Sequence, residues 1–203
     1  MEDPKMRKVQ ELVVNLKNQD LDDETRGQVA GILGEIGGET AVDPLLAVLT
    51  SSDSWRLRLA CLKSLGKLPG AEKTVPVLER IATNKEERVD LRKWAIDAWI
   101  KISKDTTKTI PIAVDPTENE TVRTAAIENF DGNENDEAQE KLALLIEKPD
   151  EPLKLKWSIL TYLSRHGRSP RLIEILDPLT TDDLIEEDLQ YAVKNALTKL
   201  KSR

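Results

Sequence analysis

One motif recurs six times along the chain at a spacing of 31 to 34 residues, and this period constrains the fold more than any other feature. Each copy begins with a polar, mostly cationic residue. A small or β-branched residue follows three positions later, and a large apolar residue seven positions later. Offsets of three and seven lie on one side of an α-helix, so each copy predicts one helix with a buried stripe. The leading residues are Arg26, Arg58, Arg92, Arg123, Lys156 and Gln190.

A second, shorter apolar segment lies before each of these helices. In the second unit, for example, Val42, Leu45 and Leu49 are three and four positions apart, which is typical of an amphipathic helix. Each unit is therefore predicted to consist of a helix A, a turn and a helix B. Prolines near the start of three A helices fit this prediction, because a first turn tolerates the missing N–H: Pro44, Pro76 and Pro111.

Capping residues precede several of the predicted B helices. In the fourth unit, Pro111 and the step from Asp115 to Pro116 confine helix A to a short segment, because the residue before a proline is disfavoured in a helix. We expect a local irregularity there. The predicted starts of B helices are Asp22-Asp23, Ser52-Asp53-Ser54, Thr117-Glu118-Asn119 and Thr181-Asp182-Asp183.

The composition suits a stack of such units. Charged residues make up 33% of the chain and aromatic residues 3%, which indicates an aliphatic core and much surface per residue. One small helix pair cannot bury its apolar stripe alone, whereas pairs that stack side by side share a continuous core. We therefore predict one all-α domain over residues 1–203, with units at about 4–37, 38–69, 70–103, 104–132, 133–167 and 168–203.

Segments 24–37 and 41–49 resemble the HEAT-like repeat, in particular the subtype first noted in phycobilisome bilin lyases; the step Val122-Arg123 and the run from Arg58 to Gly66 match it best. The resemblance implies a right-handed α–α superhelix, or solenoid, of about six HEAT-like helix pairs, with the B helices along a concave surface. It also implies a structural ladder of hydrogen bonds between units, with an anion-binding stripe as the alternative. That ladder should weaken toward the C-terminus, at Lys156 and Gln190. Its residues are Asp22, Arg26, Arg58, Arg92, Arg123 and Lys156.

The sequence predicts no metal and no cofactor. With one cysteine, Cys61, and one histidine, His166, it has neither a cysteine-based nor a multi-histidine site, and it contains no phosphate-binding glycine loop. Cys61 lies in the buried column. His166 ends a helix, where a cation interacts favourably with the helix dipole. A catalytic histidine is the alternative that the pattern supports least.

Charge and hydropathy limit the partners and the location. A net charge of −7 argues against nucleic acid. The charged N-terminal residues lack the apolar run of a signal peptide, and no stretch approaches the roughly 18 apolar residues that span a membrane. We therefore expect a cytoplasmic protein whose partner is another protein and not a membrane.

Four residues outside the buried stripe are candidates for binding that partner, because aromatic residues are enriched at binding hot spots. Trp99 shares the buried column and is expected in the core, and Trp94 is expected between neighbouring units. Three of the four candidates share the column directly after the leading residue. If this column faces the concave groove, the candidates line it; otherwise they fill gaps between helices. The set is Trp55, Leu59, Trp157 and Tyr191.

These features favour a scaffold or adaptor that binds a partner protein in its concave groove over an enzyme. The alternative, a bilin lyase or related cofactor-attachment or chaperone protein of the phycobilisome-lyase type, follows from the resemblance alone. A HEAT-like DNA glycosylase would need a basic aromatic groove, whereas the basic residues here are spread along the chain.

Overall fold

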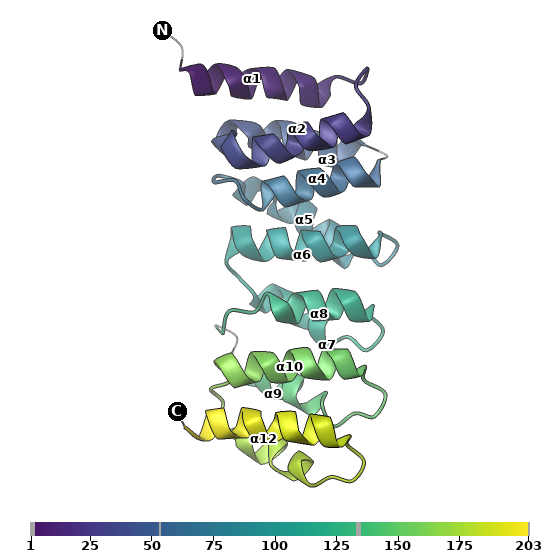
Figure 1. The fold of residues 1–203 in the computed structure, drawn as a ribbon, viewed down its shortest axis with the longest axis vertical. Helices are drawn as coiled ribbons and strands as arrows, with labels where there is room; N and C mark the ends of the chain where they lie inside the picture. The colour runs from purple at the N-terminus through teal and green to yellow at the C-terminus, as the bar shows by residue number, and fades with distance from the viewer. Residues whose placement is uncertain (1–2, 53, 133–134, 203) are drawn as a thin grey trace. The chain divides into compact units, whose positions relative to one another are not determined.

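The protein is all-α in the part of the chain that a computed structural model describes, residues 3–52, 54–132 and 135–202. Twelve α-helices and four short 3₁₀ helices follow one another there without a strand, which confirms the predicted fold class. The chain divides into two compact units, residues 1–104 and residues 105–203 (Figure 1). Of the described helices, none is long and apolar enough to span a bilayer.

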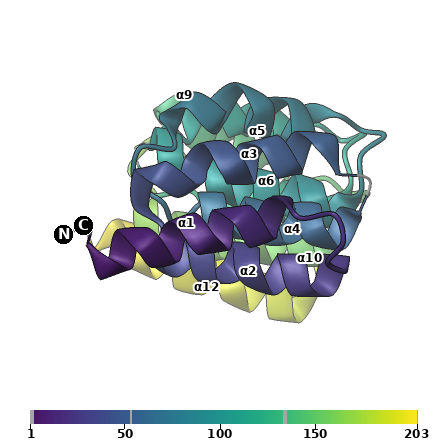
Figure 2. The ribbon, with the colours of Figure 1, turned by 90° about the horizontal axis from the view of Figure 1, so that it is seen from above.

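The first unit contains three helix pairs in two layers. Each A helix packs on the B helix that follows it, and α2, α4 and α6 contact one another in sequence order. Figure 2 shows α3 and α5 on one side of this unit and α2 and α4 on the other. The helices are α1 (Pro4–Lys17), α2 (Asp23–Ile36), α3 (Val42–Ser51), α4 (Trp55–Leu65), α5 (Val75–Thr83) and α6 (Val89–Ser103).

The second unit repeats this plan with shorter A helices. Here α8 packs on α10 and α10 packs on α12, while α9 contacts both α7 and α11. The helices are α7 (Ile110–Val114), α8 (Glu120–Glu128), α9 (Asp136–Leu144), α10 (Leu153–His166), α11 (Arg171–Leu176) and α12 (Glu187–Lys201). The 3₁₀ helices of the chain are η1 (Gly38–Ala41), η2 (Glu72–Thr74), η3 (Thr107–Thr109) and η4 (Pro178–Thr180).

The fourth helix pair shows the predicted irregularity. Helix α7 has only five residues and carries Pro111 in its first turn. It ends because Asp115, the residue before Pro116, takes an extended conformation with φ −72° and ψ 111°.

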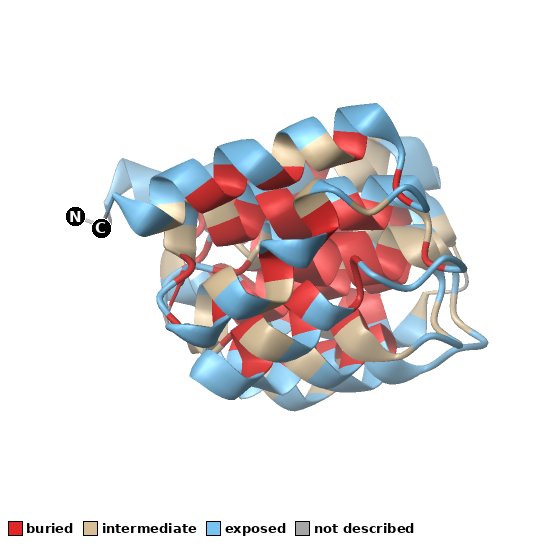
Figure 3. Cartoon of the chain, turned by 90° about the horizontal axis from the view of Figure 1, so that it is seen from below, coloured by how far each residue is buried: buried red, intermediate tan, exposed pale blue. Residues whose placement is uncertain are grey.

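The core of each unit lies between its two helix layers, where the buried positions of the helices face inward (Figure 3). The repeat columns supply much of this core, as the period predicts. Burying one such aliphatic side chain contributes about 2 kcal/mol to stability. The twelve column residues, all at most 8% exposed, are Val29, Leu33, Cys61, Leu65, Ala95, Trp99, Ala126, Phe130, Ile159, Leu163, Val193 and Leu197.

Side-chain caps start three of the B helices near the expected residues. The carboxylate of Asp22 accepts a hydrogen bond from the Thr25 amide at 2.8 Å, and the side chains of Ser54 and Asn119 cap α4 and α8. Asp53, also expected at a helix start, lies outside the described residues. The start expected at Thr181-Asp182-Asp183 is wrong, because the Asp182 carboxylate accepts from the Leu184 amide in a turn and α12 begins only at Glu187.

The arginine column joins the two helix layers. In four helix pairs, the arginine Nε on helix B donates to a backbone carbonyl in the last turn of the A helix of the same pair. Carbonyls there have no partner within the helix, so each arginine satisfies one that would otherwise be unbonded. The four bonds run from Arg26 to Leu16 (3.0 Å), from Arg58 to Leu49 (3.3 Å), from Arg92 to Ala82 (2.9 Å) and from Arg123 to Ala113 (3.0 Å).

Arg58 and Arg123 also bind a carboxylate of the following helix pair. Arg58 forms an ion pair with Glu87, just before α6. Arg123 binds Glu151 with both terminal nitrogens, at 2.6 and 3.0 Å, and both residues are buried. One guanidinium therefore connects three segments: its own helix B, the preceding helix A and the loop that leads to the next helix B.

We predict that Arg123→Ala lowers the free energy of unfolding by about 3 kcal/mol, because it leaves the buried Glu151 carboxylate without its partner. Urea denaturation measures this loss. Arg171, whose ion pair with Glu140 leaves its side chain 68% exposed, is the control. Arg171→Ala should cost less than about 1 kcal/mol. Equal midpoints for the two variants would contradict the role given to Arg123.

We also predict that Glu87→Gln reduces the loss of stability in acid. Burial raises the pKa of Glu87, but the hydrogen bonds from Arg58 and from the Arg88 amide, with the charges of both arginines, outweigh it and hold the pKa below 4.5. The ionised carboxylate thus stabilises the fold above pH 4.5, and this contribution is lost as the pH falls through the lowered pKa. Urea midpoints from about pH 6 to about pH 3 should decline less for Glu87→Gln than for the parent, and Glu72→Gln should follow the parent.

Candidate partner-binding site

The four residues proposed to bind a partner lie on B helices, but in different units. Trp55 and Leu59 belong to α4 in the first unit, whereas Trp157 on α10 and Tyr191 on α12 belong to the second. The structure brings Trp157 and Tyr191 together, where they line a hollow of about 220 Å³ between α10 and α12. Both side chains reach solvent, Trp157 at 39% and Tyr191 at 67% exposure.

Trp55 is held between charges of its own unit. The guanidinium carbons of Arg56 and Arg88 lie 4.7 and 4.5 Å from the centre of its ring. Such cation–π contacts stabilise an indole at the surface and cover part of it. Trp55 and Leu59 are each half-buried, so this pair presents less free apolar surface than Trp157 and Tyr191 do.

The other two tryptophans, Trp94 and Trp99, both lie on α6 of the first unit. Trp99 is 1% exposed, as expected of a core residue. Trp94 is half-buried beneath the ammonium of Lys63 on α4, which lies 4.5 Å from its ring centre, so it contacts the neighbouring helix pair.

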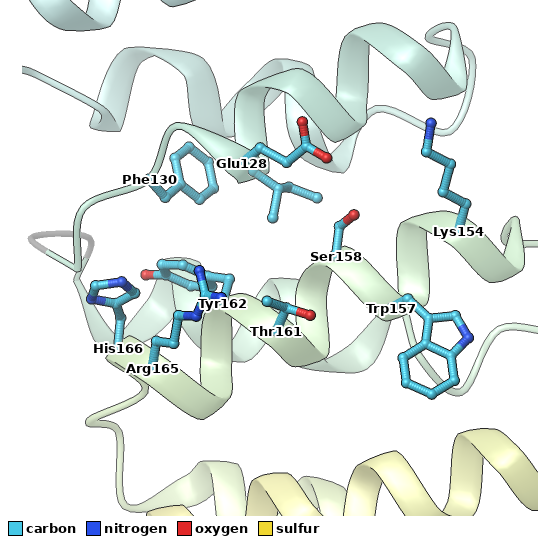
Figure 4. Close-up of a pocket in the computed structure, with 10 residues that line it drawn as sticks. Glu128, Phe130, Lys154, Trp157, Ser158, Thr161, Tyr162, Arg165 and His166 are labelled. Carbon is cyan, nitrogen blue, oxygen red and sulfur yellow. The ribbon is translucent and has the colours of Figure 1, made fainter.

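A second hollow, of about 260 Å³, lies on the other side of Trp157, between α8 and α10 (Figure 4). Three rings form its closed end. Phe130 meets Tyr162 edge to face, with ring centres 5.5 Å apart, and Tyr162 stacks on His166 at 5.6 Å. Edge-to-face and stacked rings attract one another beyond the area that they bury.

Helix α10 builds this groove from two adjacent rows of side chains. Lys154, Ser158, Tyr162 and His166 are each four residues apart, so they lie along one stripe of the helix. The row that starts at Trp157 continues through Thr161 and Arg165. The groove thus combines exposed charged side chains, Lys154, Arg165 and Glu128 of α8, with an aromatic end where Phe130 and Tyr162 are buried.

The end of α10 that carries His166 is fixed by a buried amide. Gln139 of α9 is fully buried, and its Nε2 donates to the His166 carbonyl at 3.3 Å. Its Oε1 accepts from the Arg168 amide at 2.8 Å. On the other side Gly132, with φ +89°, lies so close that a Cβ built there would be 2.7 Å from His166 Nδ1. The aromatic end of the groove is therefore closely packed.

The groove is suited to binding an apolar or aromatic side chain between polar rims. The single cysteine lies elsewhere, since Cys61 is in the core of the first unit, where burial raises the pKa of its thiol to about 12. A thiol with so high a pKa stays protonated and is a poor nucleophile. In the described part of the chain, no group of three or more His, Cys, Asp or Glu residues is placed to hold a metal ion.

The residues assigned to the ladder differ in their contacts. Asp22 caps α2 through the amide and hydroxyl of Thr25, while Arg26 pairs with Asp23 at 3.3 Å. Lys156 is 8% exposed, and among the described residues its ammonium has no hydrogen bond or ion pair.

Reasoning from the sequence missed the groove formed by Phe130, Tyr162 and His166. Phe130 was counted as core, and His166 as a helix-end cation. The distribution of aromatic residues does point to this region, because four of the seven Phe, Tyr and Trp residues of the chain lie from position 130 to position 191. The spacing of four between Tyr162 and His166 is also that of side chains stacked on one helix face.

We predict that Gly132→Ala lowers the free energy of unfolding by about 1 to 3 kcal/mol, because alanine is strained at this positive φ and its Cβ would collide with His166. Urea denaturation measures the loss, and a shift of the His166 ring resonances in NMR spectra would report the displaced imidazole. Gly31→Ala is the control. It lies in a helix with no atom near the added Cβ, so it should raise stability by up to about 1 kcal/mol.

Comparisons with known proteins identify a family similarity within the first unit. Residues 9–99 match the family model described as HEAT repeats. No curated protein is a significant match to the sequence. Among solved structures, human deoxyhypusine hydroxylase in complex with glycerol is similar over 98% of both chains, with a TM-score of 0.38 and 11% identity, which is too distant to bear on function. The match does not extend to the phycobilisome-lyase subtype. The similarity to HEAT repeats thus covers residues 9–99, slightly less than half of the chain.

Proposed function

We propose that this chain is an interaction scaffold that binds a partner protein on the B-helix face of its second unit. HEAT repeats are generally protein-binding, and the helix pairs of this chain leave the outer faces of α10 and α12 open to solvent. The observation that carries the proposal is the exposure of two large aromatic side chains, Trp157 and Tyr191, side by side across one hollow.

Trp157 is the centre of the proposed contact. It lines the 260 Å³ groove on one side and the 220 Å³ hollow on the other, so a partner could surround it with two inserted side chains. Tryptophan and tyrosine are the residues that most often dominate binding energy when a partner covers them. An indole that is exposed to solvent does not stabilise the fold by burial. Large exposed apolar surfaces are instead typical of binding sites.

The surroundings of Trp157 define what kind of surface would fit. Small neutral residues such as Ser158, Thr161 and Ala192 flank it and leave room for a partner's side chains. Three cationic side chains line the two hollows: Lys154, Arg165 and Lys199. Among the described lining residues, the only carboxylate is Glu128. A partner with an apolar or aromatic centre and carboxylates around it would complement this arrangement.

The alternative function, cofactor attachment of the phycobilisome-lyase type, is supported by the resemblance of the repeats only. It would be favoured if a phycobiliprotein or its pigment were recovered with the chain. The exposed aromatic pair supports binding of a protein surface directly, so the scaffold is the better supported function.

We predict that the double change Trp157→Ala and Tyr191→Ala weakens partner binding at least tenfold, because truncating a hot-spot aromatic costs about 2 kcal/mol or more. The partner would first be captured by a photo-crosslinking residue placed at position 161, between the two aromatics. Its affinity for the purified parent and variant would then be measured by biolayer interferometry.

Leu144→Ala is the matched control, since Leu144 of α9 is similarly exposed, at 45%, but lies on an A helix. It should leave the affinity unchanged. Both variants should melt near the parent temperature because the side chains are exposed. If the aromatic variant melts early, or if Leu144→Ala weakens binding equally, the proposed surface is wrong.

A further inference from the structure

We propose a second interaction surface, at the edge of the second unit where two loops lead into α10 and α12, and we infer that it binds a basic segment of a protein that also carries apolar side chains. This edge lies at the N-terminal ends of these helices, and its hollow shares no lining residue with the aromatic hollows. Figure 1 shows both loops on the same side of the unit. The surface goes beyond the aromatic site and does not depend on it.

The first observation is the distribution of charge. Residues 1–104 contain 17 basic and 17 acidic residues, whereas residues 105–203 contain 13 and 20, so the whole net charge of −7 belongs to the second unit. The two loops concentrate it. Residues 147–151 and 182–186 together contain six carboxylates and one lysine, Lys148.

The second observation is a hollow of about 310 Å³ between these loops. Its apolar wall comes from Leu153, Ile185 and Leu189, and its polar wall from Glu147, Glu151, Asp182 and Glu186 together with Lys156. Glu151 is already bound by Arg123. The other three carboxylates therefore face a single ammonium group.

Leu184 at the rim of this hollow is the most exposed large apolar residue of the described chain, at 93%. Its turn is held from both sides. The Leu184 amide donates to the Asp182 carboxylate at 2.9 Å, and Gln190 donates through Nε2 to the carbonyls of Asp182 and Ile185 at 2.9 and 3.2 Å. A hydrogen-bonded turn thus presents an uncovered leucine beside the hollow.

The third observation is Lys156, in the position where other units have an arginine. Arg58 and Arg123 each form an ion pair with a carboxylate of the next loop, Glu87 and Glu151 respectively. In the hollows that these pairs line, the arginine charge therefore neutralises that carboxylate. Lys156 is 92% buried and lines the hollow, yet its ammonium has no partner among the described residues. The stem of Lys156 is thus covered while its ammonium is not among the buried unpaired atoms, so it opens into the hollow and is available to an acceptor that a ligand brings.

These three features specify the chemistry of the occupant. Lysine or arginine side chains would pair with Glu147 and Glu186. An apolar side chain would cover Leu184 and Leu153, and a backbone carbonyl of the bound segment would accept from Lys156. A segment of mixed basic and leucine-like residues supplies all three, whereas nucleic acid would be repelled by the carboxylates.

The test uses the full chain and a fluorescein-labelled peptide of leucine and lysine, with fluorescence anisotropy as readout. Peptides of leucine and glutamate and of serine and lysine are the comparisons. The leucine–lysine peptide should bind most tightly. Leu184→Ser should weaken it about tenfold through lost apolar burial, and Leu184→Met should restore it. Glu147→Gln with Glu186→Gln should weaken it about fivefold and flatten its salt dependence.

Two matched controls separate this surface from net charge and from general stickiness. Glu137→Gln with Glu174→Gln removes the same charge from α9 and α11 of the same unit, and Leu144→Ser removes an exposed leucine from α9; both should leave the affinity unchanged. Trp157→Ala should also leave it unchanged, so failure here is distinct from failure of the aromatic site. The proposal is overturned if the parent shows no saturable binding, if the serine–lysine peptide binds equally well, or if both glutamine pairs weaken binding alike.

Discussion

The hydrogen bond from an arginine Nε to the end of the preceding A helix is the contact on which the rest of the structure depends. It is made at Arg26, Arg58, Arg92 and Arg123, and each time it joins the two layers at the point where helix A ends. The carbonyl has no partner within its own helix, and the guanidinium is nearly buried, so neither group can be removed without leaving the other unsatisfied. In these four helix pairs, this bond fixes which face of the B helix turns inward.

The two proposed surfaces lie on α10 and α12, whose leading residues, Lys156 and Gln190, do not make this bond among the described residues. Once the leading residue of each repeat turns inward, the next position, occupied by Trp157 and Tyr191, reaches the outer face of its helix. In the second unit, the loops that precede α10 and α12 are then placed together along one edge. There the ladder residue changes from arginine to Lys156, which lacks the planar fork needed to bind both a carbonyl and a carboxylate. Among the described residues, the change leaves Lys156 and the carboxylates around it, apart from Glu151, without an ion-pair partner, and this is the physical basis for a second, acidic surface.

The repeat period determined most of the fold that could be predicted. The offsets of three and seven identified twelve buried positions, and Pro111 with Asp115-Pro116 located the short α7. The start of α12 was misplaced because Asp182 resembles a helix cap, and only the structure shows its carboxylate committed to a turn. The shared column placed Trp157 beside Tyr191, but it could not show that Trp55 and Leu59 belong to another unit. The stacked rings of Phe130, Tyr162 and His166 depend on contacts between helices and on Gly132, which a repeat pattern does not contain.

The order of the packing contacts has a consequence for how this chain reaches its native state. Helices that pack extensively on one another belong to the same helix pair or to pairs that are adjacent in the sequence, such as α2 with α4 and α10 with α12. Only short stretches of chain have to be closed to form these contacts, so the entropy lost before the first favourable contact is small. Topologies of this kind fold rapidly, and nucleation can begin at more than one place along the sequence. A substitution that slows nucleation in one unit therefore leaves the other free to initiate folding.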